Sequence, residues 1–317
     1  MKKLIYLLFC IIFSCLFILT GCRPTTSSPT TTYKIGVLRV HDSLPLYVAE
    51  HENLFKEMGV PIQIVEFNSA LDQRKAMESG ALDGMMTDMI VTSLLKKGGT
   101  DVRIIATALG ATPKEGRFLI VSSPNSTIQT PTDLYKGNVA IAHNTMMEYL
   151  LNQYEEELHL DSTKIKTIQL PNLSLRVDAV LAGKDVKAAI LPDPLASYAV
   201  QKGAHIVIDD TKLKGNYSQS VIIMKKNILT QHANDMSRFL SAYHLAITHI
   251  NENPTAYRAL ALQKAGIPKD ISNTYNPPSF TPHALPSPQE VQQVMRWMVA
   301  KKLLPTPYTY EEMVKVS

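Results

Sequence analysis

The sequence predicts an α/β fold with two lobes that face each other like a clamshell, and a helical C-terminal region packed on the first lobe. From Tyr33 onward, short apolar runs alternate with longer amphipathic segments, a pattern typical of parallel strands joined by helices. The alternation occurs in two sets, each followed by one extra strand. From Ile228 to the end, the pattern is mostly helical.

The first set of elements predicts the sheet and helices of the first lobe. Ser43 precedes a helix with Pro45 in its first turn, and Asn68 or Ser69 precedes the next helix; both are typical helix starts. The predicted strands are 33–40, 61–67, 83–86 and 102–109, and the predicted helices are 44–58, 70–79 and 87–97.

The second set repeats the style of the first and predicts the second lobe. Its predicted strands are 138–142, 165–170, 188–191 and 205–208, and its predicted helices are 145–158, 173–182 and 194–201. Two further strands, 116–122 and 219–224, carry the chain from one lobe to the other and back. Three C-terminal helices at 234–251, 254–265 and 288–301 would return to the first lobe.

The N-terminus predicts export and lipid attachment. Lys2 and Lys3 precede an apolar run over 4–20, and Leu-Thr-Gly leads into Cys22. This order is typical of a signal peptide, and its end resembles a bacterial lipobox, whose cysteine is acylated. The alternative, a transmembrane anchor, leaves the small residues before Cys22 unexplained. We therefore expect a lipid-anchored protein on the extracytoplasmic face of the cell membrane.

These observations divide the chain into four predicted parts. Residues 1–21 are the lipoprotein signal peptide, 22–32 a flexible tether, 33–120 with 220–317 the first lobe, and 121–219 the second lobe.

Composition excludes several classes of protein. The three cysteines are Cys10, Cys15 and Cys22, so the segment after Cys22 has neither a disulfide nor a thiolate metal site. A net charge of only +4, with two of the positive charges on Lys2 and Lys3, gives no reason to expect nucleic acid as a partner. The nine histidines are scattered, and no hydrolase, nucleotide-binding or zinc-protease motif occurs. We expect no cofactor, no metal and no catalytic residue.

Several short segments follow one another at a spacing known from one superfamily. They are Lys-Ile-Gly-Val-Leu at 34–38, Leu-Pro-Leu-Tyr-Val-Ala-Glu at 44–50, Leu-Phe-Lys-Glu-Met-Gly at 54–59, Val-Glu-Phe at 65–67, Ala-Met-Glu-Ser-Gly-Ala-Leu-Asp at 76–83 and Leu-Pro-Asp-Pro at 191–194. Through these segments, nearly the whole chain after the tether resembles the type II periplasmic binding proteins of ABC importers. It is most similar to the branch that binds nitrate, sulfonates such as taurine, and pyrimidine precursors of thiamine.

The resemblance implies a substrate-binding lipoprotein that captures a small organic molecule between its lobes. It would deliver the molecule to an ABC permease driven by an ATPase. Three alternatives stay open: a sensing or adhesion lipoprotein on the same fold, a metal-capture lipoprotein, and an enzyme like the pyrimidine-precursor synthases. Those synthases carry a cysteine-rich motif that this chain lacks.

Ligands of open α/β sheets bind beyond the carboxyl ends of the strands, where helix N-termini offer free N–H groups. The turns at these ends therefore give the candidate ligand-binding residues, although several of them also fit plain helix caps. Asp193, between two prolines, is the foremost candidate. The full set is Ser43, Leu44, Asn68, Ser69, Thr87, Asp88, Gly110, His143, Asn144, Thr145 and Asp193.

Two of these candidates carry charge that bears on the ligand. Unpaired carboxylates at Asp88 and Asp193 would oppose an anion, because burying like charges together is costly. The sequence therefore favours a neutral or cationic small molecule. Methionines 85, 86, 89, 146 and 147 fit either the floor of a pocket or the core, and methionine is more typical of the core.

Overall fold

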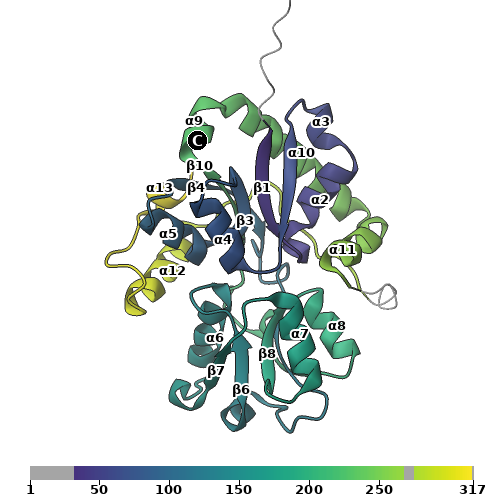
Figure 1. The fold of residues 1–317 in the computed structure, drawn as a ribbon, viewed down its shortest axis with the longest axis vertical. Coiled ribbons are helices and arrows are strands. Elements are labelled where there is room, and N and C mark those ends of the chain that lie inside the picture. The colour runs from purple at the N-terminus through teal and green to yellow at the C-terminus, as the bar shows by residue number, and fades with distance from the viewer. Residues whose placement is uncertain (1–31, 268–274, 316–317) are drawn as a thin grey trace, which may run out of the picture. The chain divides into compact units, whose positions relative to one another are not determined.

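The computed structural model describes residues 32–267 and 275–315. The predicted signal peptide, the predicted anchor Cys22 and the predicted tether up to residue 31 lie outside the described residues. Figure 1 shows two sheets, each flanked by helices. This is the predicted α/β arrangement with two lobes.

The first lobe is built on a five-stranded sheet. Its strand order is β2-β1-β3-β10-β4, in which β10 runs antiparallel to both neighbours. Tyr33 pairs with Ile62 at the start of the parallel pair β1 and β2. The strands are β1 (Tyr33–Leu38), β2 (Ile62–Phe67), β3 (Gly84–Asp88), β4 (Val102–Leu109) and β10 (Ser220–Lys225). The helices are η1 (His41–Ser43), α2 (Leu44–His51), α3 (Leu54–Glu57), α4 (Ala70–Glu78) and α5 (Met89–Lys97).

The second lobe repeats this topology. Its strand order is β7-β6-β8-β5-β9, and β5 runs antiparallel to β8 and β9. The strands are β5 (Phe118–Ser122), β6 (Asn138–Ile141), β7 (Lys166–Gln169), β8 (Ala188–Pro192) and β9 (His205–Asp209). The helices are η2 (Pro131–Lys136), α6 (Met146–Glu157), η3 (Ser162–Lys164), α7 (Leu173–Ala182), α8 (Leu195–Gln201) and η4 (Asp210–Lys212).

The C-terminal helices pack on the first lobe, as predicted (Figure 1). α10 packs against α2 and α3, where Phe239 stacks on Phe55, while α12 packs on α5 and α13 on β4. The helices of this region are α9 (Lys226–Gln231), α10 (Ala233–Glu252), η5 (Pro254–Tyr257), α11 (Arg258–Ala265), α12 (Pro288–Ala300) and α13 (Tyr310–Met313).

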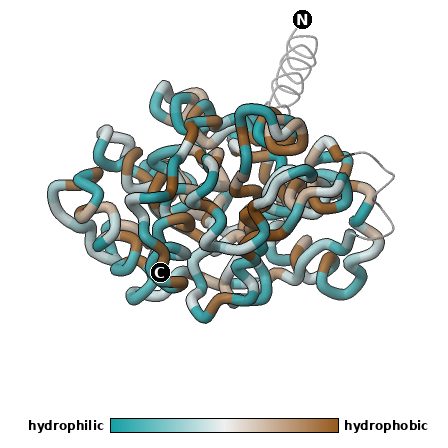
Figure 2. Tube along the Cα trace, turned by 90° about the horizontal axis from the view of Figure 1, so that it is seen from below, coloured by the Kyte–Doolittle hydropathy of each residue, from teal (hydrophilic) through white to brown (hydrophobic). Residues whose placement is uncertain are grey.

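Apolar side chains fill the interior of both lobes. Every residue of β3, β5 and β8 is buried, because helices cover both faces of each sheet. Figure 2 shows the hydrophobic segments running through the trace, with hydrophilic turns around them. A burial pattern without alternation is what a central strand of such a sheet requires.

Both sheets are mixed, whereas the sequence predicted parallel sheets. The exception in each sheet is the strand that arrives from the other lobe: β5 follows β4, and β10 follows β9. These strands enter from the edge where the lobes face each other, so they run against their neighbours. β5 pairs with β8 and β9 throughout, so residues 118–120, placed in the first lobe by the sequence, pair in the second sheet.

Two predicted helix bounds need correction. The helix predicted at 44–58 is interrupted at Asn53, whose φ of 61° is left-handed, a conformation that asparagine tolerates. The helix predicted from Thr87 begins at Met89, because the Asp88 carboxylate accepts a hydrogen bond from the Val91 N–H and so caps it. Thr87 and Asp88 therefore end β3.

Candidate ligand-binding site

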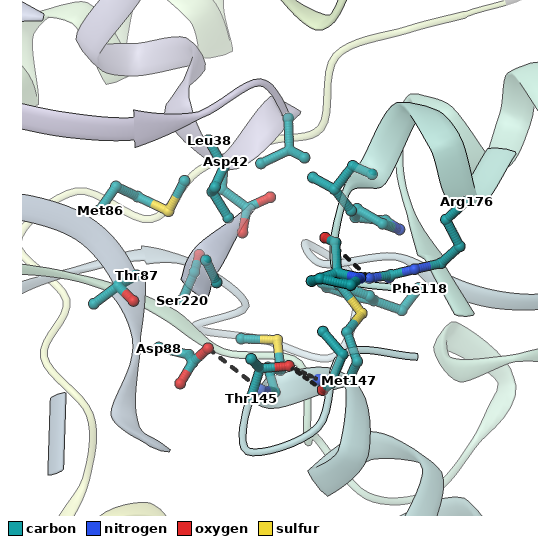
Figure 3. Close-up of a pocket in the computed structure, with 17 residues that line it drawn as sticks. Leu38, Asp42, Met86, Thr87, Asp88, Phe118, Thr145, Met147, Arg176 and Ser220 are labelled. Atoms are coloured by element: carbon teal, nitrogen blue, oxygen red, sulfur yellow. Dashed lines mark hydrogen bonds between the residues drawn. The ribbon is translucent and has the colours of Figure 1, made fainter. Parts of the chain in front are cut away.

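A cavity lies where the two sheets face each other (Figure 3). It is bordered by the carboxyl ends of β1, β3, β6 and β8, the turn after β7, and the first residues of β5 and β10. Antiparallel β5 and β10 begin at this edge, where the parallel strands end. The lining residues are Leu38, Val40, Asp42, Ala70, Met86, Thr87, Asp88, Phe118, Ala142, Thr145, Met146, Met147, Pro171, Leu173, Arg176, Pro192 and Ser220.

The first lobe places three unpartnered polar atoms in this cavity. Eight buried side-chain nitrogen or oxygen atoms of the described residues have no hydrogen-bond partner, and three of them line the cavity: Asp42 Oδ1, Thr87 Oγ1 and Ser220 Oγ. Their side chains belong to residues that are 4%, 3% and 2% exposed. Because leaving such a group unpaired costs about 1–3 kcal/mol, this concentration at one place points to a missing partner.

Two of these groups are neighbours in the first sheet. Thr87 pairs with Val221 of β10, next to Ser220, which pairs with Asp88. Asp42 comes from η1, the turn that follows β1. His41 Nε2, also buried and without a hydrogen-bond partner among the described residues, lies 3.6 Å from Asp42 Oδ1. Figure 3 shows Asp42, Thr87, Asp88 and Ser220 together on one side of the cavity.

Asp88 touches both lobes. Its Oδ1 accepts a hydrogen bond from the Val91 N–H of α5 at 2.8 Å, and its Oδ2 accepts one from the Met146 N–H of α6 at 3.3 Å. Burial raises the pKa of Asp88 to about 6, and the N–H donors oppose that rise. The carboxylate thus lies between two helix N-termini from different lobes.

Arg176 provides the positive charge on the opposite side (Figure 3). It is fully buried on α7 and donates hydrogen bonds to three backbone carbonyls, those of Leu170, Ile190 and Pro171, at 2.8, 3.0 and 3.3 Å. Burial lowers its pKa to about 10, so it remains charged at neutral pH. The cavity therefore combines one guanidinium with the two carboxylates of Asp42 and Asp88.

Most of the remaining lining is apolar, and much of it consists of flexible methionine side chains. Met86, Met146 and Met147 line the cavity together with Phe118, whereas Met85 and Met89 pack in the core away from it. Methionine adapts to irregular shapes, so three of them suit a surface that must close on a small molecule.

The lobes already touch across the cavity. Besides the bond to Asp88, the Leu173 N–H donates to the Asn68 carbonyl at 3.1 Å, and the His41 N–H donates to the Asp193 carbonyl at 3.4 Å. The cavity has a volume of about 50 Å³. That is room for about three or four water molecules, so a larger ligand requires the lobes to move apart.

Three of the predicted site residues line the cavity: Thr87, Asp88 and Thr145. Asn68 and Asp193 lie beside it and bridge the lobes through their backbone carbonyls. The Asp193 carboxylate, predicted as the foremost ligand contact, instead pairs with Arg117 at 3.5 Å and accepts from the Ser197 N–H at 2.8 Å. The same Arg117 also pairs with Asp209.

The other predicted residues have partners within the protein. Ser43 and Leu44 are buried, and the Ser43 hydroxyl donates to the Leu38 carbonyl. Ser69 caps α4. Gly110 has a φ of 81° and sits at the crossing between the lobes, where its carbonyl accepts a hydrogen bond from Asn216. His143 and Asn144 lie in the turn before α6, where their backbone N–H groups donate to Gln169 and Glu148.

The sequence-based selection missed three polar residues of the cavity. Asp42 lies in the turn after the first strand, next to the predicted Ser43. Arg176 lies in the first turns of α7 rather than before it. Ser220 is the first residue of β10. Because β10 is antiparallel to its neighbours, its first residue lies at the edge where the parallel strands end, and a rule that considers only turns after strands does not include it.

Two negative findings apply to the part of the chain that the structure describes. Within residues 32–267 and 275–315, no group of three or more histidine, cysteine, aspartate or glutamate residues could hold a metal ion. Over the same residues, no helix has the length and apolar character needed to span a membrane.

Among curated proteins, the chain is similar to YtlA of Bacillus subtilis (strain 168), a proposed binding protein. The two are 24% identical over 251 residues, which cover 73% of this chain and 69% of YtlA.

Solved structures show the same fold. The alkanesulfonate-binding protein SsuA of Xanthomonas axonopodis pv. citri, bound to MOPS, matches with a TM-score of 0.74 and 18% identity, over 92% of this chain and 100% of SsuA. The periplasmic aliphatic sulphonate-binding protein SsuA of Escherichia coli matches with a TM-score of 0.72 and 21% identity, over 89% and 97%. The desulfurization enzyme DszB shares the fold at a TM-score of 0.64 and 14% identity, over 89% and 96%.

The fold is thus that of the periplasmic binding proteins, and at these identities the solved structures establish the fold alone. A family model described as "NMT1/THI5 like" matches residues 41–257. Because that match spans more than half of the sequence, the chain belongs to the NMT1/THI5-like family.

Proposed function

We propose that this chain is the substrate-binding lipoprotein of an ABC transporter and captures a small organic molecule between its two lobes. The observation that carries the proposal is the set of three buried, unpartnered polar atoms on Asp42, Thr87 and Ser220. They line one cavity at the facing edges of both sheets, the place where ligands of α/β folds bind. The family and the fold support the same role.

The chemistry of the cavity favours a neutral or cationic ligand with N–H donors. Asp42 Oδ1 can accept a hydrogen bond from a ligand amine or amide, and the hydroxyls of Thr87 and Ser220 can donate to a ligand oxygen or nitrogen. Asp193 no longer contributes to this argument, because Arg117 neutralises it. Its place is taken by Asp42, whose basic neighbour is the His41 ring at 3.6 Å and not a guanidinium.

Capture would proceed by opening and closure of the lobes. The cavity is too small for an organic ligand as it stands, so the lobes would separate about the two crossings, 110–117 and 210–219. The ligand would bind one lobe, and closure would bring the second set of lining residues onto it. The two lobes would be the moving units. The first comprises 33–120 with 220–317 and the second 121–219, except that the boundary after the first segment lies before Phe118, where β5 begins.

The loaded form would dock on a membrane permease powered by an ATPase. Acylated Cys22 would hold the protein on the extracytoplasmic face of the membrane, and 22–32 would leave the lobes free to reach the permease.

An enzyme is the second candidate, since DszB shares the fold. The cavity argues against this candidate. Among the described residues, neither the Thr87 nor the Ser220 hydroxyl has a base as a hydrogen-bond partner, which an activated nucleophile requires. No cysteine follows Cys22.

A thermal-shift screen of the purified protein tests the proposal. The panel contains small amines, aminopyrimidines, amides, sulfonates, nitrate and amino acids. A ligand at 100 times its dissociation constant stabilises the folded protein by about 2.7 kcal/mol, which corresponds to a shift of several degrees. We expect a neutral or cationic compound to give such a shift, and cells lacking the protein to take up that compound more slowly.

A folded protein that no compound of the panel stabilises would count against the proposal. So would turnover of a stabilising compound into a product, which would favour the enzyme.

A further inference from the structure

The N-terminus of α6 receives an acceptor from the opposite lobe. The Met146 N–H is the first of α6, and the Asp88 carboxylate of the first lobe accepts its hydrogen bond. Within α6 itself, the Thr145 hydroxyl accepts from the Met147 N–H at 3.2 Å. A helix N-terminus carries free N–H groups and partial positive charge, and so favours an anion. Here the protein's own carboxylate occupies that position.

Asp88 is suited to this double role by its place in the sequence. It is the last residue of β3 and the N-cap of α5, so one carboxylate oxygen is held by the Val91 N–H while the other points to α6. It is buried, and two N–H donors from two helices stabilise its negative charge.

The space beside Asp88 is arranged for a ligand. Thr87 and Ser220 flank it in the sheet, and their hydroxyls have no partner among the described residues. In the proposed function, these unpartnered groups would hold a ligand next to the carboxylate and not on the α6 terminus. An anionic group entering the cavity would meet the negative charge of Asp88 and find the α6 N–H already bonded.

We propose that Asp88 is a specificity-determining residue: its carboxylate bonds the lobes together at α6 and excludes anionic solutes from the cavity. This inference rests on the proposed function only in that both concern the cavity between the lobes. It predicts that removing the carboxylate frees the Met146 N–H and lets Arg176 and the α6 terminus attract an anion.

Two variants separate this role from the helix cap. In Asp88→Ser, the hydroxyl can still cap α5, since serine caps about as well as aspartate, but it is too short to reach Met146. In Asp88→Asn, the amide oxygen can accept from Val91 while the charge is gone. Asp161→Asn is the matched control, because Asp161 caps the short helix η3 and does not line the cavity.

The probe is methanesulfonate, titrated calorimetrically into the full-length purified protein at pH 7.5, with circular dichroism confirming that each variant is folded. We expect Asp88→Ser and Asp88→Asn to bind methanesulfonate at least tenfold more tightly than the wild-type and Asp161→Asn proteins. If either folded variant binds methanesulfonate no more tightly than the wild type does, the proposal is overturned.

A second measurement needs no variant. In the ligand-free wild-type protein, hydrogen exchange should show the Met146 amide protected, because Asp88 accepts its hydrogen bond. Exchange at the rate of an unbonded amide would overturn the proposal even if both variants failed to fold.

Neither measurement depends on finding the natural ligand. If no compound of the screen stabilises the protein, solute capture is contradicted, but the tighter methanesulfonate binding of the variants and the protection of the Met146 amide are still expected. If a solute binds the wild type but the variants bind methanesulfonate no more tightly, only the role of Asp88 is contradicted.

Discussion

Substituting Thr87 with valine should stabilise the ligand-free protein and weaken its binding of ligand. Thr87 is 3% exposed, and its hydroxyl has no hydrogen-bond partner among the described residues. Valine has nearly the same shape without the hydroxyl. The substitution therefore removes a group that the folded protein buries without a partner but that a ligand would use.

The size of both effects follows from the state of this hydroxyl. An unpaired buried polar group costs about 1–3 kcal/mol, so the free energy of unfolding should rise by about 1–2 kcal/mol. That corresponds to a melting temperature higher by about 2–4 °C per kcal/mol. A ligand that loses one hydrogen bond of about 1 kcal/mol should bind about fivefold more weakly.

Urea unfolding of the purified protein measures the first effect, and Thr92→Val is the matched control. Thr92 is also fully buried, but its hydroxyl donates to the Asp88 carbonyl at 2.7 Å. Its substitution should lower the free energy of unfolding by about 1 kcal/mol, with the denaturant slope unchanged in both variants. If Thr87→Val loses stability as Thr92→Val does, the Thr87 hydroxyl already has a partner and is not held in place for a ligand.

Three further substitutions probe the surroundings of the cavity. Arg117→Met leaves the buried carboxylates of Asp193 and Asp209 without their cation. Because Arg117 is itself one-third exposed, we expect the free energy of unfolding in urea to fall by about 2–4 kcal/mol. A decrease under about 0.5 kcal/mol would contradict the pairing. Burial raises the pKa of Asp210 to about 6, so the folded state binds its proton more tightly than the unfolded chain does, and stability from this group falls as pH rises from about 4 to 6. The stability of the wild type relative to Asp210→Asn should therefore rise by about 2 kcal/mol between pH 7 and pH 4.5, and a constant difference would refute the shift. Gly110→Ala would place a Cβ 2.5 Å from a backbone oxygen at a φ of 81°; it should cost at least about 2 kcal/mol, and a neutral result in thermal unfolding would contradict this geometry.

Local signals in the sequence were enough to predict most elements of the fold. Helix 173–182 and strand 102–109 have the predicted bounds. Asn172 caps that helix, and Gly183 ends it in the left-handed conformation. The boundary between β3 and α5 was predicted two residues too early, because the polar pair Thr87 and Asp88 is typical of a helix start, whereas here it ends the strand and Asp88 caps the helix.

The site was predicted less completely because its charges are paired over long distances in sequence. The rule of turns after strands found Thr87, Asp88 and Thr145, since strand ends meet at one edge. It could not reveal that Arg117, at the crossing between the lobes, neutralises Asp193. Nor could it reveal that Ser220 reaches the same edge from the opposite direction. Both facts follow from the two crossings of the chain, which no local pattern encodes.

Calorimetric titration of a compound that stabilises the protein tests the central claim, that the cavity between the lobes captures a solute. The compound is titrated into the wild type, Ser220→Ala and Ser93→Ala. Ser93 is an equally buried serine whose hydroxyl donates to the Met89 carbonyl outside the cavity. We predict one binding site in the wild type, an affinity at least fivefold lower in Ser220→Ala, and no change in Ser93→Ala. Unchanged affinity in Ser220→Ala, or an equal loss in both variants, would contradict the claim that this cavity is the binding site.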